Sequence, residues 1–191
     1  MATVVESDVI AGVMLVEPVV HGDARGLFVE TFRHEWIPHS REMIQMNRAD
    51  RQAGCIVGLH YHRFQSDYWY VPFGRARIVL HDLRFGSPTG GATLSVDRGA
   101  REDGVHDHGG IYIPPGVAHG FASLTDMTIT YLVDGYYDPK DELGVAWDDP
   151  EVDADWGLDG AAPILSGRDG ANPRRAEISR DMRPEFSPAQ S

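Results

Sequence analysis

The chain has 191 residues, with 29 acidic against 17 basic side chains and a formal charge of −12. One domain is the default at this length, and so acidic a protein does not hold nucleic acid or an anionic membrane through its overall field. Cys55 is the single cysteine, which excludes an intrachain disulfide, and we expect a reduced cytoplasm. Charges interrupt the apolar run at 13–16, so we expect neither a signal peptide nor a membrane span.

Short runs rich in Val, Ile, Tyr and Phe alternate with Gly, Pro and Asp along the chain, which is typical of an all-β sandwich or barrel. In order, this pattern predicts strands at 12–20, 27–33, 44–48, 55–62, 67–71, 75–83, 93–97, 110–113, 118–123 and 127–136. A short helix is expected around 34–42. We expect one domain over 1–191, with its core at about 12–170, a C-terminal arm, and a poorly ordered tail at 179–191.

Alternation along two of these strands predicts which side chains face the interior. His60 and His62 share a face with Ile56 and Gly58, because side chains two apart point the same way. Tyr131 lies on the apolar face of its own strand. We therefore expect one hydroxyl and two imidazoles to point into one barrel, whose interior can hold a small ligand.

One segment has the spacing of a metal site, G-x5-H-x-H-x4-D-x6-G starting at position 54. His60, His62 and Asp67 from this segment can converge with His119 on one divalent cation. His119 ends the run Pro-Pro-Gly-Val-Ala-His. The two segments resemble the two motifs of the cupin superfamily, with aspartate where metal cupins usually carry glutamate. The resemblance implies a cupin-type antiparallel β-barrel, or jelly roll, with short helices, and many such barrels hold no metal.

A narrower resemblance rests on nine segments that occur in order between about Gly12 and Asp169. They are DARGLF with Glu30, QMN, GLHY, GSPT, IPPGVAHGF, YYDP, WDDP, DW and LSGRD. This set resembles the dTDP-4-dehydrorhamnose 3,5-epimerase family of cupins. The resemblance implies an isomerase that acts on a 4-keto-6-deoxyhexose carried by thymidine diphosphate. It also implies a homodimer formed through the β-sheets, in which an N-terminal strand lends residues to the neighbour's site.

The chemistry of such an epimerase needs a base and an acid on opposite faces of the sugar. The C4 carbonyl acidifies the protons on C3 and C5, so one group removes a proton and another returns one from the other side. By resemblance, His60 is the base, Asp169 orients it, and Tyr131 is the proton donor. Neither a cofactor nor a metal is required for this reaction.

The resemblance also assigns a binding shell for the nucleotide sugar. Arg25 is expected at the diphosphate, because a guanidinium fork suits phosphate oxygens. The other expected contacts are Glu30, Gln45 and Asn47 at the nucleotide end, His119 at the sugar, Tyr137 stacked on the base, and Glu142 and Arg168 at the mouth.

Two positions depart from the family pattern. Val57 stands where the family usually has an arginine that contacts the diphosphate, and Asp67 stands where it usually has a lysine near the enolate. Arg63 or Arg75 is a candidate to compensate. Three hypotheses stay open: an epimerase at C3 and C5 or at C3 alone, a metal-dependent cupin enzyme, and a nucleotide-sugar-binding protein without turnover.

Overall fold

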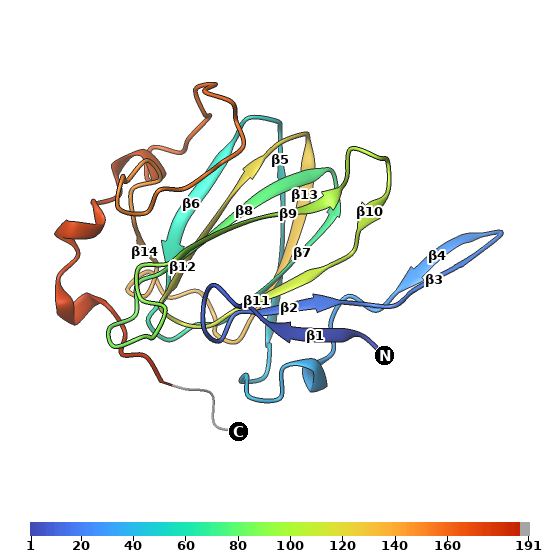
Figure 1. Cartoon of the computed structure of the whole chain (residues 1–191), viewed down its shortest axis with the longest axis horizontal. Coiled ribbons are helices and arrows are strands. Elements are labelled where there is room, and N and C mark those ends of the chain that lie inside the picture. Colours follow the sequence, from blue (N-terminus) through green and yellow to red (C-terminus); the bar gives the residue numbers. More distant parts are fainter. Residues whose placement is uncertain (188–191) are drawn as a thin grey trace.

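The computed structural model describes residues 1–187, which form two six-stranded sheets and one separate hairpin (Figure 1). The first sheet has the order β1 (Thr3–Glu6), β2 (Met14–Glu17), β11 (Gly110–Ile113), β7 (Asp67–Phe73), β13 (Met127–Val133) and β5 (Gln45–Arg51). The second has the order β10 (His106–Asp107), β9 (Thr93–Ala100), β8 (Arg75–Asp82), β12 (Val117–Ser123), β6 (Ile56–Tyr61) and β14 (Leu143–Gly144). Neighbouring strands pair antiparallel in both sheets, as expected for the antiparallel β-barrel that the motifs imply.

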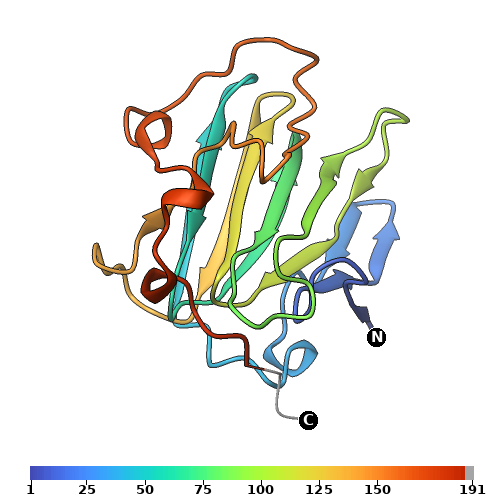
Figure 2. The ribbon, with the colours of Figure 1, turned by 60° about the vertical axis from the view of Figure 1, so that its left-hand side comes forward.

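The main core lies between the two sheets. Val71 and Ile129 from the first sheet pack there with Ile78 and Phe121 from the second. A second apolar cluster covers the other face of the second sheet, beneath the C-terminal arm, and Trp156 belongs to it. Figure 2 shows the arm in red running over this sheet. Because both of its faces are covered, β12 is buried along its whole length.

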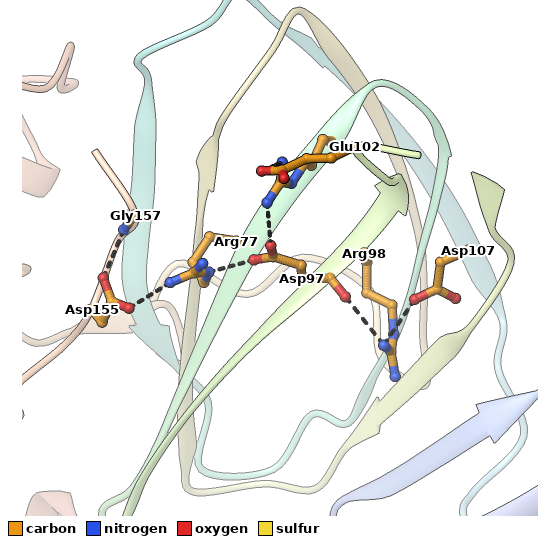
Figure 3. Close-up of polar contacts among 8 residues, drawn as sticks. Arg77, Asp97, Arg98, Glu102, Asp107, Asp155 and Gly157 are labelled. Atoms are coloured by element: carbon orange, nitrogen blue, oxygen red, sulfur yellow. Dashed lines mark hydrogen bonds and ion pairs between the residues drawn. The ribbon is translucent and has the colours of Figure 1, made fainter. Parts of the chain in front are cut away.

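Ion pairs fasten the arm to the sheet that it covers. Arg77 on β8 pairs with Asp97 on β9 and also with Asp155 of the arm (Figure 3). Asp97 accepts from Arg75 as well, at 2.7 Å. Arg77 thus joins two strands and the arm at one point.

The N-terminal quarter differs from the predicted strands and helix. Pro18 has no amide hydrogen to continue a ladder, and the expected strand at 12–20 divides into β2 and β3 (Val20–Asp23). Among the strands of residues 1–187, β3 pairs only with β4 (Gly26–Val29), and this hairpin projects from the body (Figure 1). The helix expected at 34–42 is wrong. Only the 3-10 turn η1 (His34–Trp36) forms, because Pro38 disfavours helical backbone at Ile37.

Part of the tail that was expected to be poorly ordered packs against the barrel. The turns η2 (Asp169–Ala171), η3 (Arg175–Glu177) and η4 (Arg180–Met182) lead into it. Arg180 then stacks over the ring of Phe85 at 3.5 Å, and Arg84 lies over Phe186 at 4.9 Å. Residues 188–191 lie outside the described residues. Across residues 1–187, no helix has the length and apolar content that a membrane crossing needs.

A β-bulge interrupts β6 where it pairs with β12. His119 lies opposite His60, but Phe121 lies opposite Val57, so β6 has one residue more than β12 over this stretch. Gly58 sits in the bulge with φ at +110°. A side chain there would come within 2.8 Å of the β12 backbone, so only glycine fits.

The bulge reverses the alternation on which the expected face of β6 was based. Val57, His60 and His62 line the same cavity, whereas Ile56 packs in the cluster under the arm. The prediction that Ile56 shares their face is therefore wrong, because the extra residue shifts the period by one. The expected inward direction of the two histidines is correct.

Candidate active site

A cavity of about 310 Å³ opens between the two sheets. Its walls come from β5, β7 and β13 on one side and from β6 and β12 on the other. The lining combines apolar side chains such as Phe121 and Ile129 with histidines, amides and carboxylates. Such a mixture of apolar walls with a few polar groups is typical of a small-molecule site.

His60 is held between two carboxylates. Its Nε2 lies 2.6 Å from Oδ1 of Asp169, and its Nδ1 lies 3.8 Å from Oε1 of Glu142. Since a carboxylate accepts, the neutral ring donates Nε2–H to Asp169 and keeps its lone pair on Nδ1. Burial raises the pKa of Asp169, but the hydrogen bond and charge of His60, together with hydrogen bonds from Ser166 and the Gly58 backbone, outweigh burial and hold that pKa below its usual value.

Tyr131 reaches the same cavity from the opposite sheet. It lies on β13, whereas His60 lies on β6, so the two side chains approach the cavity from opposing walls. Burial raises the pKa of the Tyr131 hydroxyl, and the negative charges of Asp67 and Glu142 raise it further. The phenol therefore keeps its proton at neutral pH and is able to donate it.

Most of the expected binding shell lines this cavity as well. Gln45 and Asn47 lie side by side on β5, with Nε2 of the first donating to Oδ1 of the second at 2.8 Å. His119, Tyr137 and Glu142 complete this set. Arg168 is not in the lining, but it reaches the edge of the cavity through Glu142, whose Oε1 lies 3.1 Å from its Nη1.

The structure does not bring Arg25 and Glu30 to the cavity of their own chain. Arg25 is on the β3–β4 hairpin, where its side chain is 90% exposed and pairs with Asp23. Glu30 follows the hairpin and lies 3.6 Å from Arg33. Both residues are therefore surface groups within a single chain.

Arg51 is a cavity residue that the sequence reasoning missed. It lines the cavity together with Val57, at the end of β5. Among the described residues that line the cavity, it is the one with a permanent positive charge. Side chains two residues apart in a strand share a face, so Arg51 shares the face of Gln45 and Asn47. This signal was not used, because the predicted strand ended at residue 48. The candidates named instead lie elsewhere: Arg75 pairs with acids on the outside of the second sheet, and Arg63 is not part of the lining.

Three of the four residues of the alternative metal site form one buried group. Donor atoms of His62, Asp67 and His119 lie within 4.8 Å of one another. Burial lowers the pKa of His119 to about 4. His60, the fourth residue, is engaged by Asp169 and stands outside this group.

Comparison with known proteins shows to which family the chain belongs. The sequence model of the dTDP-4-dehydrorhamnose 3,5-epimerase family matches residues 7–177. The chain belongs to this family. A dTDP-4-dehydrorhamnose 3,5-epimerase from Mycobacterium tuberculosis H37Rv is 37% identical in an alignment 178 residues long, which covers 88% of this chain and 86% of that protein. A Neisseria gonorrhoeae epimerase is 35% identical, and this chain spans 51% of its length.

Solved structures of epimerases share the fold of this family member. The Legionella pneumophila epimerase RmlC, in complex with dTDP-4-keto-L-rhamnose, superposes with a TM-score of 0.87 at 29% identity, over 98% of this chain and 100% of that one. ChmJ, a 3'-monoepimerase from Streptomyces bikiniensis in complex with dTDP-quinovose, gives 0.84 at 31% identity, over 95% and 93%. The jelly-roll fold expected from the motifs is confirmed.

Proposed function

We propose that the protein epimerises a dTDP-4-keto-6-deoxyhexose at carbons next to the C4 carbonyl. Membership of the epimerase family supports the reaction class. The observation that carries the proposal is the His60–Asp169 pair, which meets Tyr131 across one cavity from the opposing sheet. A base and an acid on opposite walls are what inversion at carbon requires.

Each group has a defined task in this proposal. Nδ1 of His60 takes the proton from the carbon, and the electron pair of that bond moves into the C4 carbonyl to give an enolate. Asp169 stabilises the imidazolium through Nε2–H. The Tyr131 hydroxyl then gives its proton to the opposite face of the carbon, the carbonyl re-forms, and Tyr131 regains a proton from solvent. His60 returns its proton to solvent.

Binding of the diphosphate is assigned to arginine. Val57 stands where the family usually has an arginine, and Arg51 lines the same cavity. Arg51 is therefore suited to supply the positive charge that Val57 lacks. A hydrogen bond from a guanidinium to phosphate is stronger than one between neutral groups. Gln45, Asn47, His119, Tyr137, Glu142 and Arg168 are assigned to the rest of the nucleotide sugar.

A homodimer completes the proposed site. The β3–β4 hairpin exposes Leu27 and Phe28, which are 58% and 64% exposed, beside Arg25. Apolar side chains on a projecting hairpin favour a protein partner. We assign Arg25 and Glu30 to the site of the second copy. We also assign the enzyme to the cytoplasm, where its single cysteine, the buried Cys55, stays reduced.

The test is hydrogen exchange in D2O with a dTDP-4-keto-6-deoxyhexose. Deuterium is expected at C3 and C5, or at C3 alone, and NMR of the product reports which positions exchange and which invert. Exchange at neither carbon would overturn the proposal. Binding of the nucleotide sugar without exchange would instead favour a protein that binds without turnover.

A further inference from the structure

The group formed by His62, Asp67 and His119 is not used by the proposed reaction steps. The three residues come from three places in the chain: the end of β6, the start of β7, and the middle of β12. All three are buried, and all three line the cavity. The His62 and His119 rings lie with their centroids 5.3 Å apart.

Backbone carbonyls fix which nitrogen of each ring carries the lone pair. Nδ1 of His62 lies 2.8 Å from the carbonyl oxygen of Asp141, and Nδ1 of His119 lies 2.9 Å from that of Val117. A carbonyl oxygen only accepts, so each Nδ1 carries the hydrogen. Each Nε2 then keeps a lone pair that is able to bind a metal ion. Metal-binding histidines are held in this way by a second hydrogen bond.

Asp67 is a buried carboxylate whose hydrogen-bond partners are neutral. Its Oδ1 accepts from Nε2 of Gln65 at 2.9 Å, and its Oδ2 accepts from Nε1 of Trp69 at 3.0 Å. Asp82 and Asp134, which are buried similarly, each pair with an arginine. A buried charge without a countercharge is costly, and each oxygen of Asp67 retains lone-pair capacity.

We propose that His62, Asp67 and His119 bind one divalent transition-metal ion. Two imidazole nitrogens and one carboxylate suit Mn²⁺, Fe²⁺, Co²⁺, Ni²⁺ or Zn²⁺. The cation supplies the positive charge that Asp67 lacks, and three protein ligands leave positions open for water or a ligand oxygen. His60 takes no part, because its ring does not belong to the group of donor atoms that gather within 4.8 Å of one another.

The site also gives Asp67 a role in the reaction, which rests on the proposed function. An aspartate without a countercharge beside a developing enolate would oppose the enolate by charge repulsion. With the cation bound, the same position carries net positive charge, and an open coordination position is able to accept the C4 oxygen. The cation thereby replaces the charge of the lysine that the family usually has at this position.

Metal binding is tested directly on the full chain, purified without a histidine tag and dialysed against chelator. Titration with Co²⁺, followed by visible absorption, is expected to saturate at one ion per chain, and Mn²⁺ is expected to compete. Asp67→Asn and His62→Gln are expected to weaken Co²⁺ binding more than about 10-fold, while Asp67→Glu, which keeps the carboxylate, retains it. Thermal unfolding of each variant verifies that it is folded.

The matched control is His108→Gln. The imidazoles of His106 and His108 are also neighbours, with centroids 4.5 Å apart, but neither lines the cavity. Unchanged binding in this control is expected. The proposal is overturned if the wild-type protein shows no saturable Co²⁺ binding, or if Asp67→Asn and His62→Gln bind as tightly as the wild type.

Failure of the metal site and failure of the epimerase proposal are distinguishable. If the protein binds no Co²⁺ but washes deuterium into the sugar, the cation proposal fails and the epimerase stands. If Co²⁺ binds and is lost in the Asp67→Asn variant, while neither carbon exchanges with or without metal, the site stands and the proposed reaction fails.

Discussion

At the scale of single residues, the His60 imidazole is positioned through its Nε2. Asp169 accepts from Nε2, whereas Nδ1 keeps its lone pair and lies 3.8 Å from Glu142, which in turn accepts from Arg168. The ring therefore has a fixed tautomer and a fixed direction before any ligand enters. Such preorganisation favours proton transfer, because no reorientation precedes it.

Two substitutions separate the proposed tasks of His60 and Tyr131. His60→Ala is expected to abolish deuterium exchange and to lower turnover by roughly 100-fold or more, because the base is lost. Tyr131→Phe is expected to retain exchange from the His60 face but to lose inversion, because only the opposite-face donor is missing. NMR of the sugar after incubation in D2O measures both. Melting temperatures that fall in step with activity would point to misfolding instead.

Replacement of Arg51 tests the assignment of the diphosphate contact. Arg51→Met is expected to weaken dTDP binding by about 10-fold, as the loss of one charge-assisted hydrogen bond does. Arg48→Met is the matched control, since Arg48 lies on the same strand but its side chain is exposed on the other face. Calorimetric titration with dTDP provides the measurement. Equal losses in both variants would contradict the assignment.

At the scale of elements, the bulge in β6 and the hairpin β3–β4 determine which residues reach the cavity of their own chain. The bulge turns Val57 toward the cavity beside His60, whereas the hairpin carries Arg25 away from the barrel. One chain therefore lacks Arg25 at its own cavity, which is the reason for proposing that a second copy supplies it.

Hybrid dimers test this division. Arg25→Ala and His60→Ala homodimers are each expected to have low activity. After the two are mixed and allowed to exchange subunits, activity is expected to rise, because one site of the hybrid takes Arg25 from one copy and His60 from the other. The assay is product formation, with light scattering to verify the dimer. A mixture that stays as inactive as its parents would contradict the arrangement.

The sequence predicted the positions of most strands, but it did not predict the bulge in β6 or the end of β5. Most strands of the two sheets overlap the expected ranges because their residues alternate and end at Gly, Pro or Asp. The bulge at Gly58 was not predictable from period two, since it depends on the pairing with β12. Arg51 was missed because the charged residues Arg48, Asp50 and Arg51 are untypical of a strand, so the end of β5 was placed too early. The distance between Arg25 and the cavity is set by tertiary structure alone.

At the scale of the whole molecule, the charge of −12 is a poor guide to what the cavity binds. Acidic side chains elsewhere are engaged with arginines, as in the network of Arg75 and Arg77 (Figure 3). Screening at physiological salt limits the reach of the remaining surface charge to about 8 Å. Arg51 and the proposed cation therefore dominate the electrostatic potential inside the cavity, where an anionic substrate binds.

Stability is expected to fall in mild acid because of His81. Burial lowers its pKa to about 4, with Arg175 adding to this and the acids Asp82, Asp149 and Glu151 opposing it. The unfolded chain takes up a proton near pH 6.5 that the folded chain takes up only near 4. The contribution of neutral His81 to the free energy of unfolding is therefore complete above pH 6.5. It is lost as the pH falls from 6.5 toward 4, by up to about 1.4 kcal/mol per pH unit.

Urea unfolding at a series of pH values measures this loss. The free energy of unfolding of His81→Gln is expected to depend less steeply on pH between 6.5 and 4 than that of the wild type. His34→Gln, at an exposed histidine, is the control and is expected to keep the wild-type slope. Parallel curves for wild type and His81→Gln would contradict the assignment.

Trp69 contacts two residues of the proposed metal site. Its indole nitrogen donates to Asp67, and its ring meets His119 edge-on with centroids 5.2 Å apart. An indole so placed is a built-in fluorescent reporter, because its emission responds to charge and hydrogen bonding at its nitrogen. A difference spectrum against Trp69→Phe isolates this signal from the other three tryptophans. The fluorescence of Trp69 therefore reports whether the cavity is occupied, without an added label and without turnover.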